Sequence, residues 1–282
     1  MSQEHVFARR VGDAELPQDH ITKKPVVYRI PGMEAATIRR EVEYRTTDSG
    51  PLKMDLYYPP DAKSGARIPA VVFVTGYSDV RMWPMLGWGN FKDMAASFSW
   101  GQLAAASGVV AITYANDEPT ADLFALLHYI RQHAKTLGID ENRIGLYASS
   151  GHVPLALSVL LQEDRDYLKC AVLNCGFMLD VDGSSDVAEA AKTYGFVNPG
   201  AGKSVDDLPQ DLPLFIVRAA QEQFPHLNDM IDCFLAKALA RNLPVTFVNH
   251  PGPHAFELMQ DSETSRETIR QMLAFMRFHL LA

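Results

Sequence analysis

Short apolar runs rich in β-branched residues alternate along this chain with stretches of helical periodicity, and this alternation constrains the fold more than any other feature of the sequence. The clearest runs are nearly continuous in apolar residues, as strands buried on both faces of a parallel sheet usually are. They occupy residues 70–75, 109–114, 143–148, 169–175, 213–219 and 244–250. The alternation therefore predicts a parallel sheet covered by helices.

An antiparallel pair is expected at one edge of this sheet. Residues 37–44 and 52–59 have the pattern of strands, and Asp48, Ser49 and Gly50 between them supply turn chemistry. The two best-defined helical stripes consist of Leu123, Leu126, Leu127, Ile130 and Ala134, which Gly138 follows as a stop, and of Ile269, Met272, Leu273, Met276 and Leu280. Together these patterns predict an α/β fold, with a mostly parallel twisted sheet of about eight strands and helices on both faces.

One main domain is expected, because the chain has no internal repeat and no Gly/Ser linker. At 282 residues with 47% hydrophobic side chains, it is long enough to bury a sizeable core. We expect a charged N-terminal extension at 1–36 and the domain at 37–282. The aromatic-rich segment 76–101 and the segment 176–211, where Gly, Ser, Asp and Pro interrupt a helical patch, do not follow the alternation. They are expected to be pocket or cap insertions.

Charge and cysteine content argue against several classes of protein. A formal net charge of −8 offers no basic face for nucleic acid or for an anionic membrane surface. The first residues lack the apolar core of a secretion signal, and no run approaches the ~20 apolar residues of a membrane span. Cys170, Cys175 and Cys233 are odd in number and lack metal-type spacing, as expected for reduced thiols. We therefore expect a cytoplasmic protein without a metal site, with a homo-oligomer left open.

The stretch GLYASSGHVPLAL joins a predicted strand to the start of a helix and places two serines at the corner. A sharp turn of this kind, the nucleophile elbow, exposes a serine oxygen and directs backbone N–H groups toward a developing oxyanion. Ser150 is the better nucleophile candidate, because Ser149 would put the bulky Tyr147 at the tight flank of the turn. Gly151 then supplies one N–H, whereas His152 stands where such turns normally have glycine. The alternative interpretation is a helix N-cap serine beside a turn glycine.

The base of a serine hydrolase would follow a later strand, because a triad on this architecture runs Ser, acid, His in chain order. Pro251, Gly252 and Pro253 force a loop after the last predicted strand and present His254 beyond its end. His254 is therefore the candidate base. His250 lies within or at the end of that strand and is interpreted as structural.

The candidate acid is Glu222, which comes just past the predicted strand 213–219. Asp229 lies several residues further on, inside the next expected helix, and ranks second. Asp180 and Asp182 follow an earlier strand that some folds of this type use, and they rank third. The choice between Glu222 and Asp182 stays open at this point.

The loop VTGYSD after the first buried parallel strand is where the second oxyanion donor is expected, and the main-chain N–H of Tyr77 is the natural candidate. A turn glycine in an ordinary loop is the alternative. In the segment that follows, Trp83 and Trp88 are the aromatic residues expected to touch substrate. Ordinary core packing is the competing explanation for both tryptophans.

These motifs together resemble the α/β-hydrolase superfamily, particularly its esterase and dienelactone-hydrolase-like branch. FVTGYSD, NRIGLYASSGH, the acid after FIVRA and HPGPHAF occur in the right order, and the resemblance spans residues 38–281. Dienelactone hydrolases carry cysteine at the elbow, whereas this chain has serine, which points to ester hydrolysis. Such families more often show Asp than Glu at the acid position, but Glu is a known variant.

The resemblance implies acyl transfer on a small-molecule ester substrate. Ser150 would attack the ester carbonyl while His254 accepts its proton, and Glu222 would orient the imidazole. The N–H groups of Tyr77 and Gly151 would bind the oxyanion, and water would then release the acyl group. No cofactor is required, and the sequence does not identify the substrate.

Two other classes of protein are alternatives. The stretch NPGAGKS at 198–204 resembles a phosphate-binding P-loop, but Val197 occupies a position where that motif requires glycine, and the preceding residues are helical in pattern. The more serious alternative is a hydrolase-fold protein that only binds a ligand or partner, and His152 at the elbow keeps this interpretation open. Covalent labelling of Ser150 by an organophosphonate distinguishes it from an active hydrolase.

Overall fold

The computed structural model describes residues 16–63, 65–87 and 89–282, and these residues form one eight-stranded sheet. Its strands are β1 (Thr37–Thr47), β2 (Gly50–Tyr58), β3 (Ile68–Phe73), β4 (Val110–Tyr114), β5 (Ile139–Ser149), β6 (Leu168–Asn174), β7 (Leu214–Gln221) and β8 (Val245–Pro253). Their order is β1-β2-β4-β3-β5-β6-β7-β8. Only the β1/β2 and β2/β4 pairs in this sheet are antiparallel, so the predicted mostly parallel α/β sheet is confirmed.

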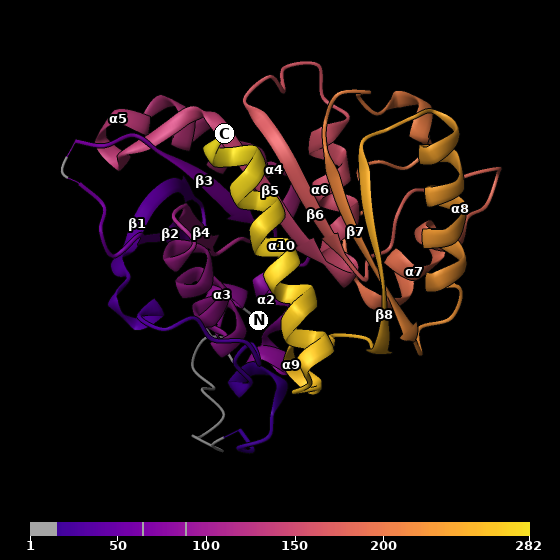
Figure 1. Cartoon of the computed structure of the whole chain (residues 1–282), viewed down its shortest axis with the longest axis horizontal. Coiled ribbons are helices and arrows are strands. Elements are labelled where there is room, and N and C mark those ends of the chain that lie inside the picture. The colour runs from indigo at the N-terminus through magenta and orange to yellow at the C-terminus, as the bar shows by residue number, and fades with distance from the viewer. Residues whose placement is uncertain (1–15, 64, 88) are drawn as a thin grey trace, which may run out of the picture.

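Helices cover both faces of the sheet, as predicted (Figure 1). They are α2 (Asp79–Leu86), α3 (Ala95–Ala106), α4 (Pro119–Gln132), α5 (Ala134–Leu137), α6 (Val153–Leu160), α7 (Asp186–Tyr194), α8 (Leu227–Ala240), α9 (Phe256–Met259) and α10 (Glu263–Leu281). Helices α3 and α10 pack on one face and bury one hydrophobic cluster, whereas α4, α6 and α8 bury a second cluster on the other. None of the described helices combines the length and apolar character that a bilayer span needs.

The local signals in the sequence correspond closely to these elements. Strands β1 and β2 form the expected antiparallel hairpin at one edge of the sheet, and Gly50 has a φ of 119°, a conformation that favours glycine. Helix α4 and the short α5 follow the predicted stripe and end at Gly138, whose φ is 64°. In α10, every residue of the predicted apolar stripe is buried.

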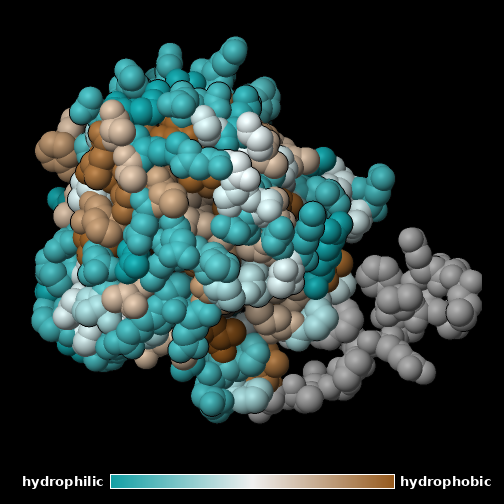
Figure 2. All heavy atoms as spheres, turned by 90° about the vertical axis from the view of Figure 1, so that its right-hand side faces the viewer, coloured by the Kyte–Doolittle hydropathy of each residue, from teal (hydrophilic) through white to brown (hydrophobic). Residues whose placement is uncertain are grey.

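The last strand differs from the prediction of a buried strand. Because β8 stands at the end of the strand order, only β7 pairs with it, and most of its residues are partly or fully exposed. Phe247 on this strand is 44% exposed and Leu239 on the neighbouring α8 is 60% exposed. Figure 2 faces this edge of the molecule, where hydrophobic side chains are interrupted by hydrophilic ones. An apolar run in the sequence therefore predicted the strand but not its position at the sheet edge.

The segments that broke the alternation meet beside the carboxyl ends of the parallel strands. Residues 76–101 contain α2 and the beginning of α3, and residues 176–211 contain α7. The Val197 N–H donates a hydrogen bond to the Gly76 carbonyl at 2.9 Å, which joins the two segments directly. Their contact places both next to the predicted serine corner.

The N-terminal residues that the structure describes pack onto the domain. The Val26 N–H donates to Ser99 Oγ at 2.8 Å in α3, and the Val27 N–H donates to the Glu257 carbonyl at 2.9 Å in α9. The side chain of Val26 is buried in the same cluster as α3 and α10. Residues 1–15 of the predicted extension lie outside the described residues.

The contact between α3 and β2 leaves no space for a side chain at Gly101. A Cβ atom there would lie 2.8 Å from ring atoms of the fully buried Tyr57. We expect Gly101→Val to lower the free energy of unfolding by about 1–3 kcal/mol, because the ring or the helix must shift. Urea unfolding measures this change. Gln102→Val puts the same side chain at the next position of the helix, and an equal loss in both variants would contradict the explanation.

Candidate active site

Ser150 lies at a strained turn between a strand and a helix. Strand β5 ends at Ser149, and a short 3-10 helix, Ser150–His152, leads into α6. Ser150 has a φ of 54°, in the left-handed region that residues other than glycine seldom adopt. Such local strain is typical of functional residues held away from a regular backbone conformation. The turn therefore has the form expected of a nucleophile elbow.

The residue after Ser150 has to be glycine for steric reasons. A Cβ atom on Gly151 would lie 2.1 Å from the Tyr77 hydroxyl oxygen and 2.7 Å from a ring atom of Phe196. Both rings come from the segments that break the strand and helix alternation. They pack against the backbone of the turn, so the elbow is enclosed by side chains from distant parts of the chain.

The structure brings His254 to Ser150. His254 directly follows β8, and Ala255 after it has a φ of 53°, so the chain turns sharply at this point. The Nε2 atom of His254 lies 2.9 Å from Ser150 Oγ, and the ring packs edge-on against Phe224 with centroids 4.8 Å apart. The nucleophile and base candidates are therefore within hydrogen-bond distance.

Glu222 lies on the other side of the same imidazole. Its Oε2 atom is 2.6 Å from His254 Nδ1, and its side chain is only 2% exposed. Oε1 accepts hydrogen bonds from the backbone N–H groups of Gln223 at 2.8 Å and Phe224 at 2.9 Å. Burial alone would raise the pKa of this carboxyl, but the hydrogen bonds from His254 and the backbone outweigh it and lower the pKa below the ordinary value.

This charge state sets the tautomer of His254. An ionised carboxylate can only accept hydrogen bonds, so Nδ1 of the imidazole carries the proton that Glu222 accepts. The opposite nitrogen, Nε2, is then free to accept the Ser150 O–H. This is the arrangement in which an imidazole can act as a general base.

The lower-ranked acids are engaged elsewhere. Asp229 lies 3.4 Å from His226 on the surface, and Asp182 forms an ion pair with Lys237 at 2.5 Å. Asp180 accepts the Val187 N–H at the start of α7. The structure therefore brings Glu222, and none of these three aspartates, to His254.

His250 also has a separate environment. It is fully buried, and its ring stacks on Phe256 with centroids 3.8 Å apart. Its Nδ1 accepts the Gly252 N–H at 3.0 Å, and its Nε2 lies 3.2 Å from Ser265 Oγ. These contacts agree with the structural role predicted for it.

His152 links the elbow to the loop that follows β3. Its Nδ1 accepts the Gly76 N–H at 2.8 Å, and its ring packs edge-on against Tyr77 and Phe91. A Cβ atom on Gly76 would lie 2.7 Å from the Gly151 carbonyl oxygen, so the loop and the elbow are in direct backbone contact. Sequence reasoning found only that this histidine replaces a glycine. No local pattern could have shown which group its ring contacts.

The same loop carries the predicted second oxyanion donor. The amide N–H of Tyr77 has no hydrogen-bond partner among the residues that the structure describes. The loop is held from two sides, because the Gly76 N–H donates to His152 and the Gly76 carbonyl accepts the Val197 N–H. An amide held in this way beside the elbow is available to a ligand.

A cavity of about 260 Å³ opens beside Ser150 and has mainly apolar walls. It is lined by Tyr77, Met82, Met85, Phe91, Ser149, Ser150, His152, Phe177, Tyr194 and Phe224. The segment 76–101 thus contributes to the pocket, but through methionines and Phe91. Trp83 lies on α2 between the two methionines and is not among these lining residues. Trp88, the other tryptophan expected to touch substrate, lies outside the described residues.

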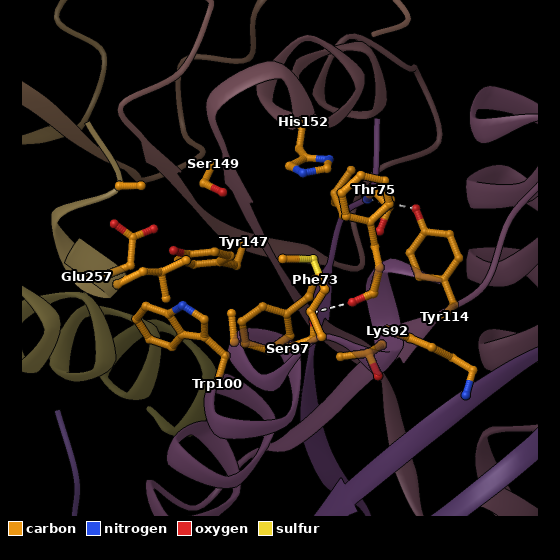
Figure 3. Close-up of a pocket in the computed structure, with 17 residues that line it drawn as sticks. Phe73, Thr75, Lys92, Ser97, Trp100, Tyr114, Tyr147, Ser149, His152 and Glu257 are labelled. Atoms are coloured by element: carbon orange, nitrogen blue, oxygen red, sulfur yellow. Dashed lines mark hydrogen bonds between the residues drawn. The ribbon is translucent and has the colours of Figure 1, made fainter. Parts of the chain in front are cut away.

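A second cavity of about 180 Å³ adjoins the first and is drawn in Figure 3. The two cavities share Phe91, Ser149 and His152 as lining residues. Between residues 16 and 282, leaving aside the undescribed positions 64 and 88, no three His, Cys, Asp or Glu side chains are grouped so that they could hold a metal ion.

No protein-family model matches this chain, and neither does any curated protein sequence. Solved structures do resemble it. A thermophilic esterase from the Planctomycetes species Thermogutta terrifontis has a TM-score of 0.61 at 18% sequence identity, over 89% of this chain and 95% of that one. For esterase B from Lactobacillus rhamnosis the TM-score is 0.64 at 17% identity, over 89% of both chains. For a bacterial heroin esterase it is 0.65 at 17% identity, over 88% of this chain and 86% of that one. The chain therefore has an α/β-hydrolase-like fold.

Because His152 is buried, we expect the stability of the fold to depend on pH. Burial lowers the pKa of His152 to about 4, whereas an exposed histidine titrates near 6.5. Between these values the unfolded chain binds a proton that the folded chain does not, so the fold loses stability as the pH falls from about 6.5 toward 4. We expect His152→Gln, whose amide oxygen can still accept the Gly76 N–H, to lose less stability than the original chain between pH 7 and pH 5. Urea unfolding at both pH values measures the loss.

The matched control is His128→Gln, at an exposed side chain on α4. It should keep the pH dependence of the original chain. An unchanged pH dependence in His152→Gln would show that His152 does not stay neutral in the folded state.

Proposed function

We propose that this chain, whose fold is that of the α/β hydrolases, is a serine hydrolase that cleaves carboxylic esters through an acyl-enzyme intermediate. The observation that carries the proposal is the chain of hydrogen bonds that connects Ser150, His254 and Glu222. Ser150 Oγ lies 2.9 Å from His254 Nε2, and His254 Nδ1 lies 2.6 Å from Glu222 Oε2. A hydroxyl, an imidazole and a carboxylate in this order activate a serine at neutral pH.

In the first half of the reaction, Ser150 Oγ attacks the ester carbonyl carbon while its proton moves to His254 Nε2. The Glu222 carboxylate stabilises the imidazolium through the hydrogen bond at Nδ1. The imidazolium then gives its proton to the departing alcohol. In the second half, His254 deprotonates a water molecule that attacks the acyl group on Ser150, and the imidazolium returns its proton to Ser150 Oγ as the acyl–oxygen bond breaks and the acid is released. Side chains and backbone dipoles carry every step, so the proposal includes no cofactor.

In this proposal, the N–H groups of Tyr77 and Gly151 bind the negative charge that develops on the carbonyl oxygen. Gly151 lies at the start of the turn that leads into α6, where the positive end of the helix dipole favours an anion. The hydrogen bond from Gly76 to His152 keeps the Tyr77 loop against the elbow. Donors positioned before the reaction are worth several kcal/mol of transition-state stabilisation, about 3–4 for one donor in a protease.

The proposed substrate is a small ester. The cavity beside Ser150 holds about 260 Å³ and has apolar walls, which suits a short acyl or alkyl group. The Thermogutta terrifontis esterase 2 has been solved with propionate and with butyrate bound. These observations support the proposal that the chain is an esterase. A role for Trp83 and Trp88 in substrate contact stays a prediction.

A non-catalytic binding protein is the second candidate, because His152 replaces a flanking glycine of the elbow. The contacts of His152 favour the first candidate. Its ring fits between Tyr77 and Phe91, and its Nδ1 fixes the loop of the proposed oxyanion donor. In a protein that only binds a ligand, no catalytic step would require His152 to make these contacts.

The assignment of the nucleophile is tested by the two neighbouring serines. We expect Ser150→Ala to lose at least about a thousandfold in kcat with p-nitrophenyl butyrate, because no other group can form the acyl-enzyme. Ser149→Ala should keep a substantial part of the activity, since its hydroxyl has no contact with His254. Steady-state kinetics measures both variants, and survival of the Ser150 variant with loss of the Ser149 variant would reverse the assignment.

Covalent labelling separates a hydrolase from a binding protein. The Thermogutta terrifontis esterase 2 is phosphonylated by sarin. A fluorophosphonate probe should add one label to this chain and none to Ser150→Ala, as read by mass spectrometry of the intact protein. Absence of labelling in the original chain would count against the proposed function.

Glu222→Gln tests the acid. The amide keeps the shape of the side chain but has no charge to stabilise the imidazolium, so we expect a loss on the order of a hundredfold or more in kcat with little change in KM. Asp229→Asn and Asp182→Asn make the same chemical change at the alternative acids and should stay close to the original activity. A nearly active Glu222→Gln together with an inactive Asp182→Asn would move the acid to the earlier strand.

A further inference from the structure

The second cavity contains a carboxyl group that the proposed mechanism does not use. Glu257 on α9 lines this cavity and is 4% exposed. Its Oε1 accepts a hydrogen bond from Asn174 Nδ2 at 3.0 Å. Its Oε2 is buried and has no hydrogen-bond partner among the described residues. Leaving a buried polar atom unpaired costs about 1–3 kcal/mol, so a native protein that keeps one invites a functional explanation.

Other polar atoms around the same hollow are also unpaired. Ser149 Oγ, His152 Nε2 and the indole N–H of Trp100 have no hydrogen-bond partners in the described part of the chain. Figure 3 shows Glu257, Ser149, Tyr147 and His152 around one open space, with the indole of Trp100 below. The space therefore offers both donors and acceptors beside aromatic and aliphatic side chains.

Among the described residues that line the cavity, no free lysine or arginine neutralises Glu257. Lys92 also lines it, but its ammonium group points away in Figure 3 and binds Glu41 at 2.6 Å and Asp55 at 3.3 Å. Burial raises the pKa of the Glu257 carboxyl, which favours the neutral form. A neutral carboxyl can both donate and accept a hydrogen bond, so its best partner is an uncharged group that does the same.

The cavity is placed to hold part of a molecule that reacts at Ser150. It shares Phe91, Ser149 and His152 with the cavity beside the nucleophile, so the two spaces meet next to Ser150. Its volume of about 180 Å³ suits a short chain. One arm of an ester bound at Ser150 has the right size and position.

We infer that this cavity binds a short arm of the ester that carries a hydroxyl group, and that Glu257 selects the hydroxyl by hydrogen bonding. The inference rests on the proposed function and names the class of substrate for it. A hydroxyl can donate to Glu257 Oε2 and accept from an unpaired N–H or O–H of the cavity. An alkyl arm would leave the buried Glu257 Oε2 unpaired, which is how a hydrogen-bonding site rejects an apolar analogue.

The experiment compares esters that differ only by a hydroxyl in place of a methyl group. For the acyl arm the pair is phenyl 3-hydroxybutyrate and phenyl 3-methylbutyrate. For the alcohol arm the pair is 3-hydroxybutyl acetate and 3-methylbutyl acetate. We expect the hydroxyl ester of at least one pair to have a kcat/KM about tenfold higher or more.

Substitutions at Glu257 then test whether this residue causes the preference. Glu257→Leu should bring the ratio within that pair down to about one or below, whereas Glu257→Gln should keep most of it, because an amide still donates and accepts. Met94→Leu changes another wall of the same cavity and should keep the ratio, whatever its effect on the absolute rates. If Glu257→Leu does not fold, Glu257→Met fills the same space with a more flexible apolar chain.

Three results would overturn the inference. Ratios near one in both pairs for the original chain would do so, as would an unchanged ratio in both apolar variants of Glu257. A preference for phenyl 3-aminobutyrate over the hydroxyl ester would assign the cavity to a cation instead. In each of these cases the methyl esters are still cleaved and the proposed function stands. Loss of all Ser150-dependent cleavage would overturn the proposed function and this inference together.

Discussion

The hydrogen bond between Nδ1 of His254 and the enclosed carboxylate of Glu222 is the interaction on which the proposed chemistry depends. At 2.6 Å it fixes the tautomer of the imidazole and aims Nε2 at Ser150. The sheet makes this arrangement possible, because β5, β7 and β8 are parallel and their carboxyl ends lie at the same end of the sheet. Hydrogen bonds from His254 and from two backbone N–H groups keep the carboxylate charged despite its burial. Burial alone would raise the pKa of Glu222 and weaken its attraction for an imidazolium.

The serine turn depends on contacts from outside the strand and helix that form it. Ser150 adopts a φ of 54°, which costs on the order of 1 kcal/mol or more, so neighbouring structure has to hold it in place. Tyr77 and Phe196 close over Gly151, and the ring of His152 binds the loop at Gly76. His152, which replaces the usual glycine of the turn, therefore adds a hydrogen bond to Gly76. It ties the turn at Ser150 to the loop proposed to bind the oxyanion.

Two cavities meet at this turn and differ in chemistry. The one that contains Ser150 has mainly apolar walls, whereas the adjoining one combines aromatic rings with unpaired polar atoms. Ser149 and His152 line both, so residues one position before and two positions after Ser150 lie where the two spaces adjoin. An ester bound across the turn would place chemically different arms in them. In the proposed arrangement, selectivity would come from buried polar groups rather than from length alone.

The sequence by itself determined the α/β architecture, the edge hairpin, the main helices and the chain order of Ser150, Glu222 and His254. These features are local, because periodicity, turn residues and loops at strand ends are properties of neighbouring residues. Only the tertiary structure decided that Glu222 and not Asp182 lies beside His254, that His152 binds Gly76, that β8 is an exposed edge, and that Glu257 faces a cavity. Such contacts join residues far apart in the chain, 104 positions for Ser150 and His254 and 76 for Gly76 and His152. A local pattern reports that a side chain is buried, but its partner is set by how the strands and loops pack together.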